Sequence, residues 1–332
     1  MIKLAWTAGL LLAALPGAAH HSPSMYDQRM FVTMQGTVVE YDWSNPHVYV
    51  RIEVPSDNGE SVVWTLENGP TTMMKRRGWT SESYVPGDRV IAHGYPVKAP
   101  RAHMLLITSI ETDNGTLYSR EGMEEALSLG GTQARASTLS GTWAVPLTQN
   151  SRFSDPATWQ LTRKGAEAAA SYDDATMNPQ IQCMARTAPW VMIFPAVHEI
   201  DVGEDVIAIS SEYDTVERTI HMNQASHAGA AVSYQGHSIG SWEGDVLVVD
   251  TVRFADHRNG NSRGIPSGSQ KHLVERFELD PARESLTYSF ELEDPEYLEA
   301  PVAGEMQWAY RPDLDFTPIE CELDNARIFV GE

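Results

Sequence analysis

The sequence predicts a mainly β protein in which a small, OB-like Greek-key barrel precedes a larger antiparallel β-barrel or sandwich of lipocalin-like architecture. Two observations favour this fold class. Short runs of β-branched and aromatic residues recur at regular spacing with turn residues between them, and one run, residues 285–292, alternates between apolar and polar positions. The chain of 332 residues is long enough for two domains with separate cores.

The smaller barrel is expected between residues 31 and 110. Strand-like alternation covers 31–41 and 48–54, and a turn at 56–59 leads into a strand over 61–66. A short helix over 70–77 ends at Gly78, and further strands follow at 89–95 and 104–110. Five short strands with one helix within about ninety residues are typical of an OB-type barrel.

In the larger domain, a helix is predicted over 161–172, and the segments 173–190 and 255–270 are expected to be long loops. The stretch 236–251 combines flanking glycines, a turn at 243–245 and an apolar run, and it predicts the central hairpin. The strands of this domain are predicted at 206–210, 216–223, 231–234, 246–252, 273–279, 285–292 and 306–311.

The N-terminal segment is typical of a secretory signal. Met1–Lys3 precede an apolar stretch from Leu4 to Leu15, and small residues around Ala19 suit a cleavage site. We therefore expect a periplasmic or secreted protein whose mature chain does not insert into a membrane. The expected division is a signal peptide at 1–19, the OB-like domain at 20–118, a linker at 119–138 and the larger barrel at 139–332.

The net charge limits the possible binding partners, and the cysteine content bears on the cellular compartment. The formal net charge is −21 and no basic run occurs, which argues against nucleic acid as a partner. The two cysteines, Cys183 and Cys321, are far apart, and in an exported protein they most simply form one disulfide that closes a long loop. Neither cysteine has the spacing of a haem site or a C-x-x-C redox pair.

Residues Gly236 to Gly240 spell G-x-S-x-G, the nucleophile elbow of serine hydrolases. An elbow needs a buried strand before the serine and a long helix after it, whereas here another predicted strand begins within six residues. We therefore interpret this stretch as part of a hairpin. A serine esterase remains a third hypothesis, with Ser238 as nucleophile, His272 as base and Asp250 or Asp256 as the orienting carboxylate.

The chain contains the motifs His20-His21-Ser22, Tyr26-Asp27, Gly36–Val38, Trp43–His47, Gly236–Gly240, Trp242–Thr251, Val274–Phe277, Asp294-Pro295 and Cys321-Glu322. Together these motifs resemble a family of exported bacterial proteins that is catalogued only as a domain of unknown function. The resemblance implies export and a two-part β architecture, and it implies no activity. This chain departs from the pattern at 255–270, which is rich in Gly, Asn and Ser and contains His257, and at Pro301-Val302, where a Trp is expected.

The first candidate site is formed by His20, His21 and His47. An N-terminal histidine with its free amine and a second imidazole can chelate copper, and Asn45-Pro46 would hold His47 in a fixed turn. This predicts a non-catalytic metal-binding module at the mature N-terminus. The alternative is that His20 and His21 only flank the cleavage site while His47 forms a hydrogen bond within the barrel.

The second candidate site arises from six histidines within 75 residues, which have no HExxH or HxH spacing that would indicate zinc. Strands could bring His221, His237 and His272 to one barrel mouth, with Asp245, Asp250 or Glu275 as the orienting carboxylate. The leading hypothesis is therefore a barrel that encloses a small, partly apolar ligand and performs acid–base chemistry of lyase, isomerase or hydrolase type. The predicted catalytic set is His237, Ser238, His272 and Asp245, and the predicted ligand-binding set is Trp242, His221, Tyr288 and Glu291.

Overall fold

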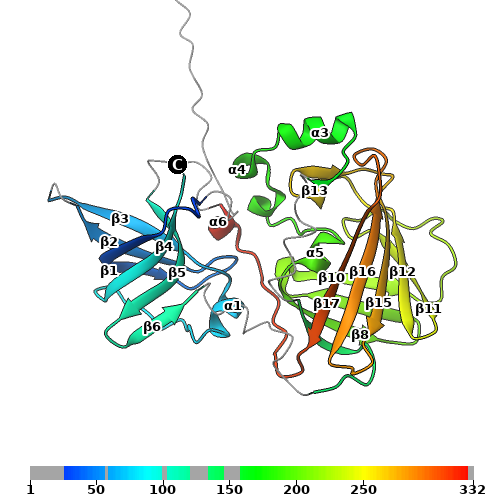
Figure 1. Ribbon diagram of the computed structural model, residues 1–332, viewed down its shortest axis with the longest axis horizontal. Helices are drawn as coiled ribbons and strands as arrows, with labels where there is room; N and C mark the ends of the chain where they lie inside the picture. The colour runs from blue at the N-terminus through cyan, green and yellow to red at the C-terminus, as the bar shows by residue number, and fades with distance from the viewer. Residues whose placement is uncertain (1–25, 57–58, 99–102, 120–133, 146–157, 328–332) are drawn as a thin grey trace, which may run out of the picture.

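The computed structural model describes residues 26–56, 59–98, 103–119, 134–145 and 158–327. Two β domains stand side by side, and a segment near the end of the described chain passes between them (Figure 1). Within the described ranges, no helix is both long and apolar enough to cross a bilayer.

The N-terminal domain is a six-stranded sheet with the order β3-β2-β1-β4-β5-β6. A parallel pairing of β3 with β5 closes five of these strands into a barrel, which confirms the OB-like prediction. The elements are β1 (Val32–Asp42), β2 (Tyr49–Pro55), β3 (Ser61–Glu67), α1 (Thr71–Lys75), β4 (Arg89–Pro96), β5 (Met104–Thr112) and β6 (Gly115–Tyr118).

The small barrel closes because its strands bend at glycine, which has no side chain. The register of β4 against β5 shifts between His93 and Gly94, and a Cβ on Gly94 would lie 2.3 Å from the carbonyl oxygen of Leu106. Alternate residues of the strands, such as Val50, Ile52 and Leu66, are fully buried inside. The barrel is therefore a packed core.

The larger domain is a closed barrel of nine strands, which confirms the predicted β-barrel. Its neighbours follow the order of the chain, so it is an up-and-down barrel with one hairpin inserted. The wall is formed by β7 (Gly141–Ala144), β8 (Val197–Val202), β9 (Val206–Ser211), β10 (Val216–His221), β11 (His237–Glu243), β12 (Val246–Val252), β15 (His272–Leu279), β16 (Ser285–Glu293) and β17 (Val302–Tyr310).

An odd number of strands has a topological consequence. Strands that alternate in direction can close a ring without a parallel pair only if their number is even, so nine strands force one parallel pair. That pair is β10–β11, which has only two residue pairs in register, Ile220 with Ser238 and His221 with Ile239. The long connection that parallel strands require is the crossover loop, residues 222–236.

The barrel interior is filled by side chains. Trp143, Tyr288, Trp308 and Phe277 are fully buried and pack together from four strands. Among them lies an ion pair in which Arg218 donates to both carboxylate oxygens of Glu275, at 2.8 and 2.5 Å. A pair of opposite charges with several hydrogen bonds satisfies the requirement for burying ionised groups.

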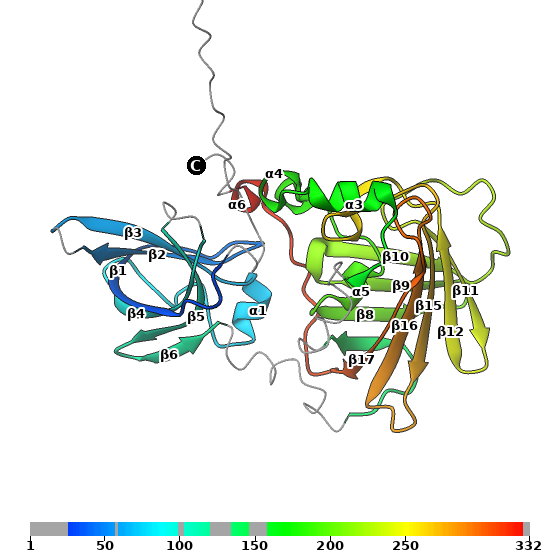
Figure 2. The same cartoon turned by 45° about the horizontal axis from the view of Figure 1, so that its top comes forward.

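One end of the barrel is covered by helices and an inserted hairpin (Figures 1 and 2). The prediction that 255–270 is a loop is wrong, because this segment pairs as β13 (His257–Ser262) and β14 (Ile265–Ser267). The segment 173–190 also contains short helices. The helices are α3 (Arg163–Ala170), α4 (Asp174–Met177), η4 (Pro179–Gln182), α5 (Trp190–Ile193), η5 (Tyr213–Thr215) and α6 (Leu323–Ala326).

The hairpin predicted over 236–251 is confirmed as β11 and β12, with seven residue pairs in register. Its turn lies at Gly244, which has φ +64°, and Ser238 lies within β11 and not on a bend. Gly240 lies close to neighbouring side chains, since a Cβ there would approach the Sδ atom of Met222 to 2.4 Å and Cγ2 of Ile220 to 2.7 Å. No long helix follows Ser238, so the architecture of a nucleophile elbow is absent at this position.

Candidate functional site

Four histidines meet on the outer face of the larger barrel, at the β10–β11 seam. His221 and His237 come from β10 and β11, His272 comes from β15, and His227 comes from the crossover loop. Along β11, β12 and β15, alternate residues are buried, so His237, Asp250 and His272 share the outer face. We call these four histidines with Asp250 and Glu293 the histidine cluster.

The members of the cluster are linked in a chain. The Nδ1 atoms of His227 and His237 are 2.8 Å apart, and the Nε2 atom of His227 is 3.3 Å from Oδ1 of Asp250. The same Oδ1 atom lies 3.3 Å from Nε2 of His272, whose Nδ1 atom is 3.6 Å from Oε2 of Glu293. The chain therefore runs from His237 through His227 to Asp250, and from Asp250 through His272 to Glu293.

The chain constrains protonation at its first link. A hydrogen bond between two Nδ1 atoms requires one to carry the proton and the other to offer a lone pair, so at least one ring is neutral. Burial lowers the pKa of His237, and the neighbouring His221, His227 and Arg253 lower it further. His221 stacks on the ring of His237 with centroids 4.9 Å apart. His237 is therefore the ring suited to act as a neutral base near pH 7.

Arg253 fixes the crossover loop that carries His227. Its guanidinium donates from Nε and Nη2 to the carbonyl oxygen of Ala230, at 3.1 and 2.9 Å. Its own backbone has φ +64°, a left-handed conformation that is unusual for a residue with a side chain. The backbone of Ser233 also bonds to Arg253 and to Ala255. These contacts hold His227 opposite His237.

A groove of about 180 Å³ lies over the seam beside His237. It forms where the wall has only two residue pairs in register, so the neighbouring strands leave room for the loop that borders it. Its lining is polar and comes from β10, β11 and the crossover loop. The lining residues are Glu217, Arg218, Thr219, His221, Ser233, Gln235, Gly236, His237 and Ser238.

Two of the predicted site residues face the interior instead. The side chain of Ser238 is buried, 2.9 Å from the hydroxyl of Thr251 and 3.5 Å from the guanidinium of Arg218. Tyr288 donates to Glu275 inside the barrel. Ser238 and His272 thus lie on opposite faces of the wall, and the predicted triad with Asp250 does not assemble.

Other predicted residues lie apart from the cluster. Asp245 is at the turn between β11 and β12, the opposite end of the hairpin from His237. Trp242 is 46% exposed near that turn, and Glu291 is exposed on β16. The predicted ligand-binding set of Trp242, His221, Tyr288 and Glu291 is therefore not brought together.

The predicted metal site falls largely outside the described residues, which begin at Tyr26 and so do not include His20 or His21. His47 is described, and its Nδ1 atom lies 3.0 Å from the carbonyl oxygen of Asn68 and 3.1 Å from Oε1 of Glu67. Over the described part of the chain, no three His, Cys, Asp or Glu side chains are arranged to hold a metal ion.

Strand register supplies the signal that the sequence reasoning missed. Asp250 pairs with Ile239 and Val274, and His272 pairs with Glu293. The outward side chains of His237, Asp250, His272 and Glu293 therefore fall at one end of four adjacent strands. The turn at Gly244 fixes which residues of β11 and β12 lie opposite each other. Once that turn is recognised in the sequence, Asp250 can be identified as a neighbour of His237. His227 carries no such signal, because only the folded loop places it.

Comparison with protein families identifies a family of unknown function (DUF6152) over residues 8–106. The match spans less than a third of the chain and covers most of the OB-like barrel, while the histidine cluster lies outside it. No curated protein matches the chain.

Proposed function

We propose that this is an exported protein that binds a small polar molecule in the groove at the β10–β11 seam and uses His237 for acid–base chemistry. Export rests on the signal-like segment at residues 1–19. The groove takes the place of the barrel interior as the ligand site, because large buried side chains fill the interior.

The observation that carries the proposal is the chain from His237 through His227 to Asp250 beside the groove. A base whose pKa is lowered accepts a proton from a bound molecule, and an imidazole hydrogen-bonded to a carboxylate orients that base and stabilises the charge that forms. The ligand is neutral or cationic, because Glu217, Asp250 and a net charge of −21 repel anions.

Hydrolysis of p-nitrophenyl acetate tests this proposal, since a neutral imidazole activates water or attacks this ester directly. The products are acetate and p-nitrophenol, so release of p-nitrophenol reports the rate. We expect His237→Ala to lower the rate at pH 7 about tenfold or more, because a positioned general base contributes roughly 10²- to 10⁴-fold on its own substrate.

The pH profile and a matched control complete the experiment. The wild-type rate should reach half its maximum below pH 6.5, the ordinary pKa of histidine, because burial lowers the pKa of His237. His103→Ala removes an exposed imidazole of the N-terminal domain and should leave the rate unchanged. Equal rates for the wild type and His237→Ala would refute the proposal.

A further inference from the structure

The segment from Arg311 to Arg327, which we call the strap, leaves β17 and runs between the two domains (Figure 1). Its first half binds the barrel. The backbone amide of Ile319 donates to the carbonyl oxygen of Glu212 at 2.7 Å, and the hydroxyl of Thr215 donates to the carbonyl oxygen of Ile319 at 3.1 Å. Leu314 and Phe316 pack on buried residues of β7 and β8.

The second half of the strap binds the N-terminal domain at the Asn45-Pro46-His47 turn. The amide of Asn325 accepts from the backbone N–H of His47 at 3.4 Å and donates to the carbonyl oxygen of His47 at 3.0 Å. The backbone amide of Glu322 donates to the carbonyl oxygen of Asn45 at 3.2 Å. Asn325 is buried, so water does not compete for the hydrogen bonds between its side chain and the turn.

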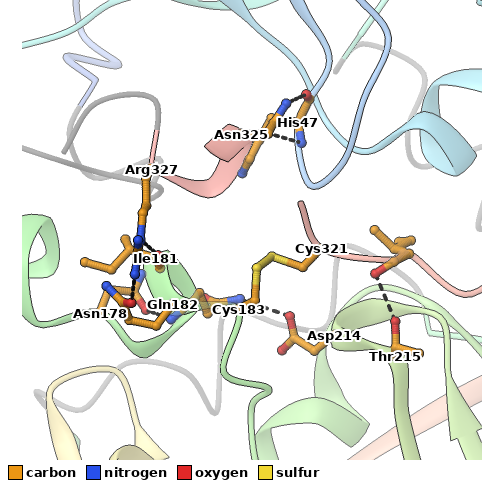
Figure 3. Close-up of a disulfide and its surroundings, with 12 residues drawn as sticks. His47, Asn178, Ile181, Gln182, Cys183, Asp214, Thr215, Cys321, Asn325 and Arg327 are labelled. Atoms are coloured by element: carbon orange, nitrogen blue, oxygen red, sulfur yellow. Dashed lines mark hydrogen bonds between the residues drawn. A yellow bond between two sulfur atoms is a disulfide. The ribbon is translucent and has the colours of Figure 1, made fainter. Parts of the chain in front are cut away.

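A disulfide stands where the strap passes from one domain to the other (Figure 3). Cys321 is bonded to Cys183, which follows η4 in the cap of the barrel, and this confirms the predicted bond. Both residues are partly exposed, and they line a cavity of about 40 Å³ together with Pro46 and His47. The bond is therefore accessible from the interface between the two domains.

Beyond Cys321, the strap is held by that bond, by Asn325 at the turn and by Arg327, which donates to the carbonyl oxygen of Ile181 at 3.3 Å. Its only regular element in the described range is α6, a single turn from Leu323 to Ala326. A helix of one turn is unstable by itself in water, so it persists only while neighbouring contacts hold it. The bond fixes the residue two positions before α6 and thereby presents Asn325 to the turn at His47.

We propose that the Cys183–Cys321 bond is a redox-controlled latch that couples the N-terminal domain to the barrel. Reduction by a dithiol breaks the S–S bond and yields two thiols, while the reductant gives up two electrons and two protons and closes to its own disulfide. The strap beyond Cys321 then frays, and the N-terminal domain loses the contacts at Asn45 and His47. A disulfide oxidant that accepts two electrons and two protons from the thiols re-forms the Cys183–Cys321 bond and restores these contacts.

Hydrogen exchange with and without dithiothreitol tests the latch. The chain has only two cysteines, so the reagent acts on this bond alone. We expect reduction to raise amide exchange in residues 322–327 and 44–48 by about tenfold or more while β12, β15 and β16 keep their protection. The double variant Cys183→Ser/Cys321→Ser should reproduce the reduced pattern without reagent.

Two outcomes would overturn the proposal. Identical exchange in the oxidised and reduced protein would show that the strap holds the domains without the bond. A loss of protection throughout the barrel would show that the bond stabilises the whole domain. Asn325→Ala in the oxidised protein should raise exchange at 44–48 with the bond intact, and unchanged exchange there would show that α6 does not dock the turn.

Discussion

The ammonium group of Lys271 is buried at the capped end of the larger barrel, just before β15. It donates to the carbonyl oxygens of Ala188 and Gly260, both at 2.6 Å, and to the hydroxyl of Thr187 at 2.9 Å. Three acceptors match its three N–H groups, while burial opposes the charge and lowers the pKa to about 7. One side chain thus joins the cap to the inserted hairpin.

Lys271→Met should destabilise the protein by about 1 to 3 kcal/mol, because a buried carbonyl oxygen loses its donor. The stability difference between wild type and variant should also change with pH. Between about pH 7 and 10.5 the unfolded lysine keeps a proton that the folded lysine has released, so the contribution of Lys271 to stability rises with pH. Urea unfolding at pH 7 and pH 9.5 measures this change, and a difference independent of pH would contradict it.

Histidines close in sequence have unrelated environments. His198 is fully buried on Trp308, with ring centroids 4.5 Å apart, and burial lowers its pKa to about 3. Burial likewise lowers the pKa of His257 to about 4, and its Nδ1 atom accepts from the backbone N–H of Asn259. The sequence shows that histidines are concentrated here but not which face of the wall each occupies, and the face decides whether a ring can reach a ligand.

At the scale of elements, the β10–β11 seam is one of the two shortest pairings in the wall, with β17–β7. The antiparallel pair β11–β12 has seven residue pairs in register, whereas the parallel pair has two. Parallel pairing is also slightly less stable for each residue. The groove and the histidine cluster lie at this seam, where the crossover loop contributes to the site.

Amide protons shared between β10 and β11 should therefore exchange about tenfold faster or more than those between β12 and β15. Exchange measured by NMR at Ile220, His221 and Ile239 against Val249 and Thr251 gives the comparison. If the two groups were equally protected, the seam would be as firmly closed as the rest of the wall.

Most strands were predictable either from an apolar run bounded by turn residues or from alternation between apolar and polar positions. The strand predicted at 246–252 matches β12, and that predicted at 285–292 matches β16 to within one residue. β13 has no such pattern, since His257–Ser262 is rich in Asn, Gly and Ser. Its polar side chains are buried by the cap, as in the bond from Asn259 to the hydroxyl of Tyr172, so tertiary contacts decide its structure.

At the scale of the whole molecule, Arg76 and Glu212 join the two domains directly. The guanidinium of Arg76, just after α1, donates to both carboxylate oxygens of Glu212, at 2.9 and 2.5 Å, and to the carbonyl oxygen of Asp315 at 3.0 Å. Glu212 is only 1% exposed and also accepts from the backbone amide of Thr317. This pair therefore connects the N-terminal domain, the barrel and the strap.

Arg76→Ala should weaken this connection by about 2 to 5 kcal/mol, because it leaves the buried carboxylate of Glu212 without its charged partner. Calorimetry of the variant should show the N-terminal domain unfolding at a lower temperature than the barrel. Arg76→Lys keeps the charge but not the paired geometry, so its effect should be intermediate. A single transition at the wild-type temperature would contradict the prediction.

The sequence by itself determined the mainly β class, the central hairpin and the disulfide, because side-chain alternation, turn residues and the presence of only two cysteines are local or countable properties. Only the tertiary structure decided which histidines meet, that Ser238 faces the interior, and that the Asn45-Pro46-His47 turn holds the strap. Barrel closure and domain docking bring residues together that are far apart in the chain, and no short stretch of sequence records such contacts.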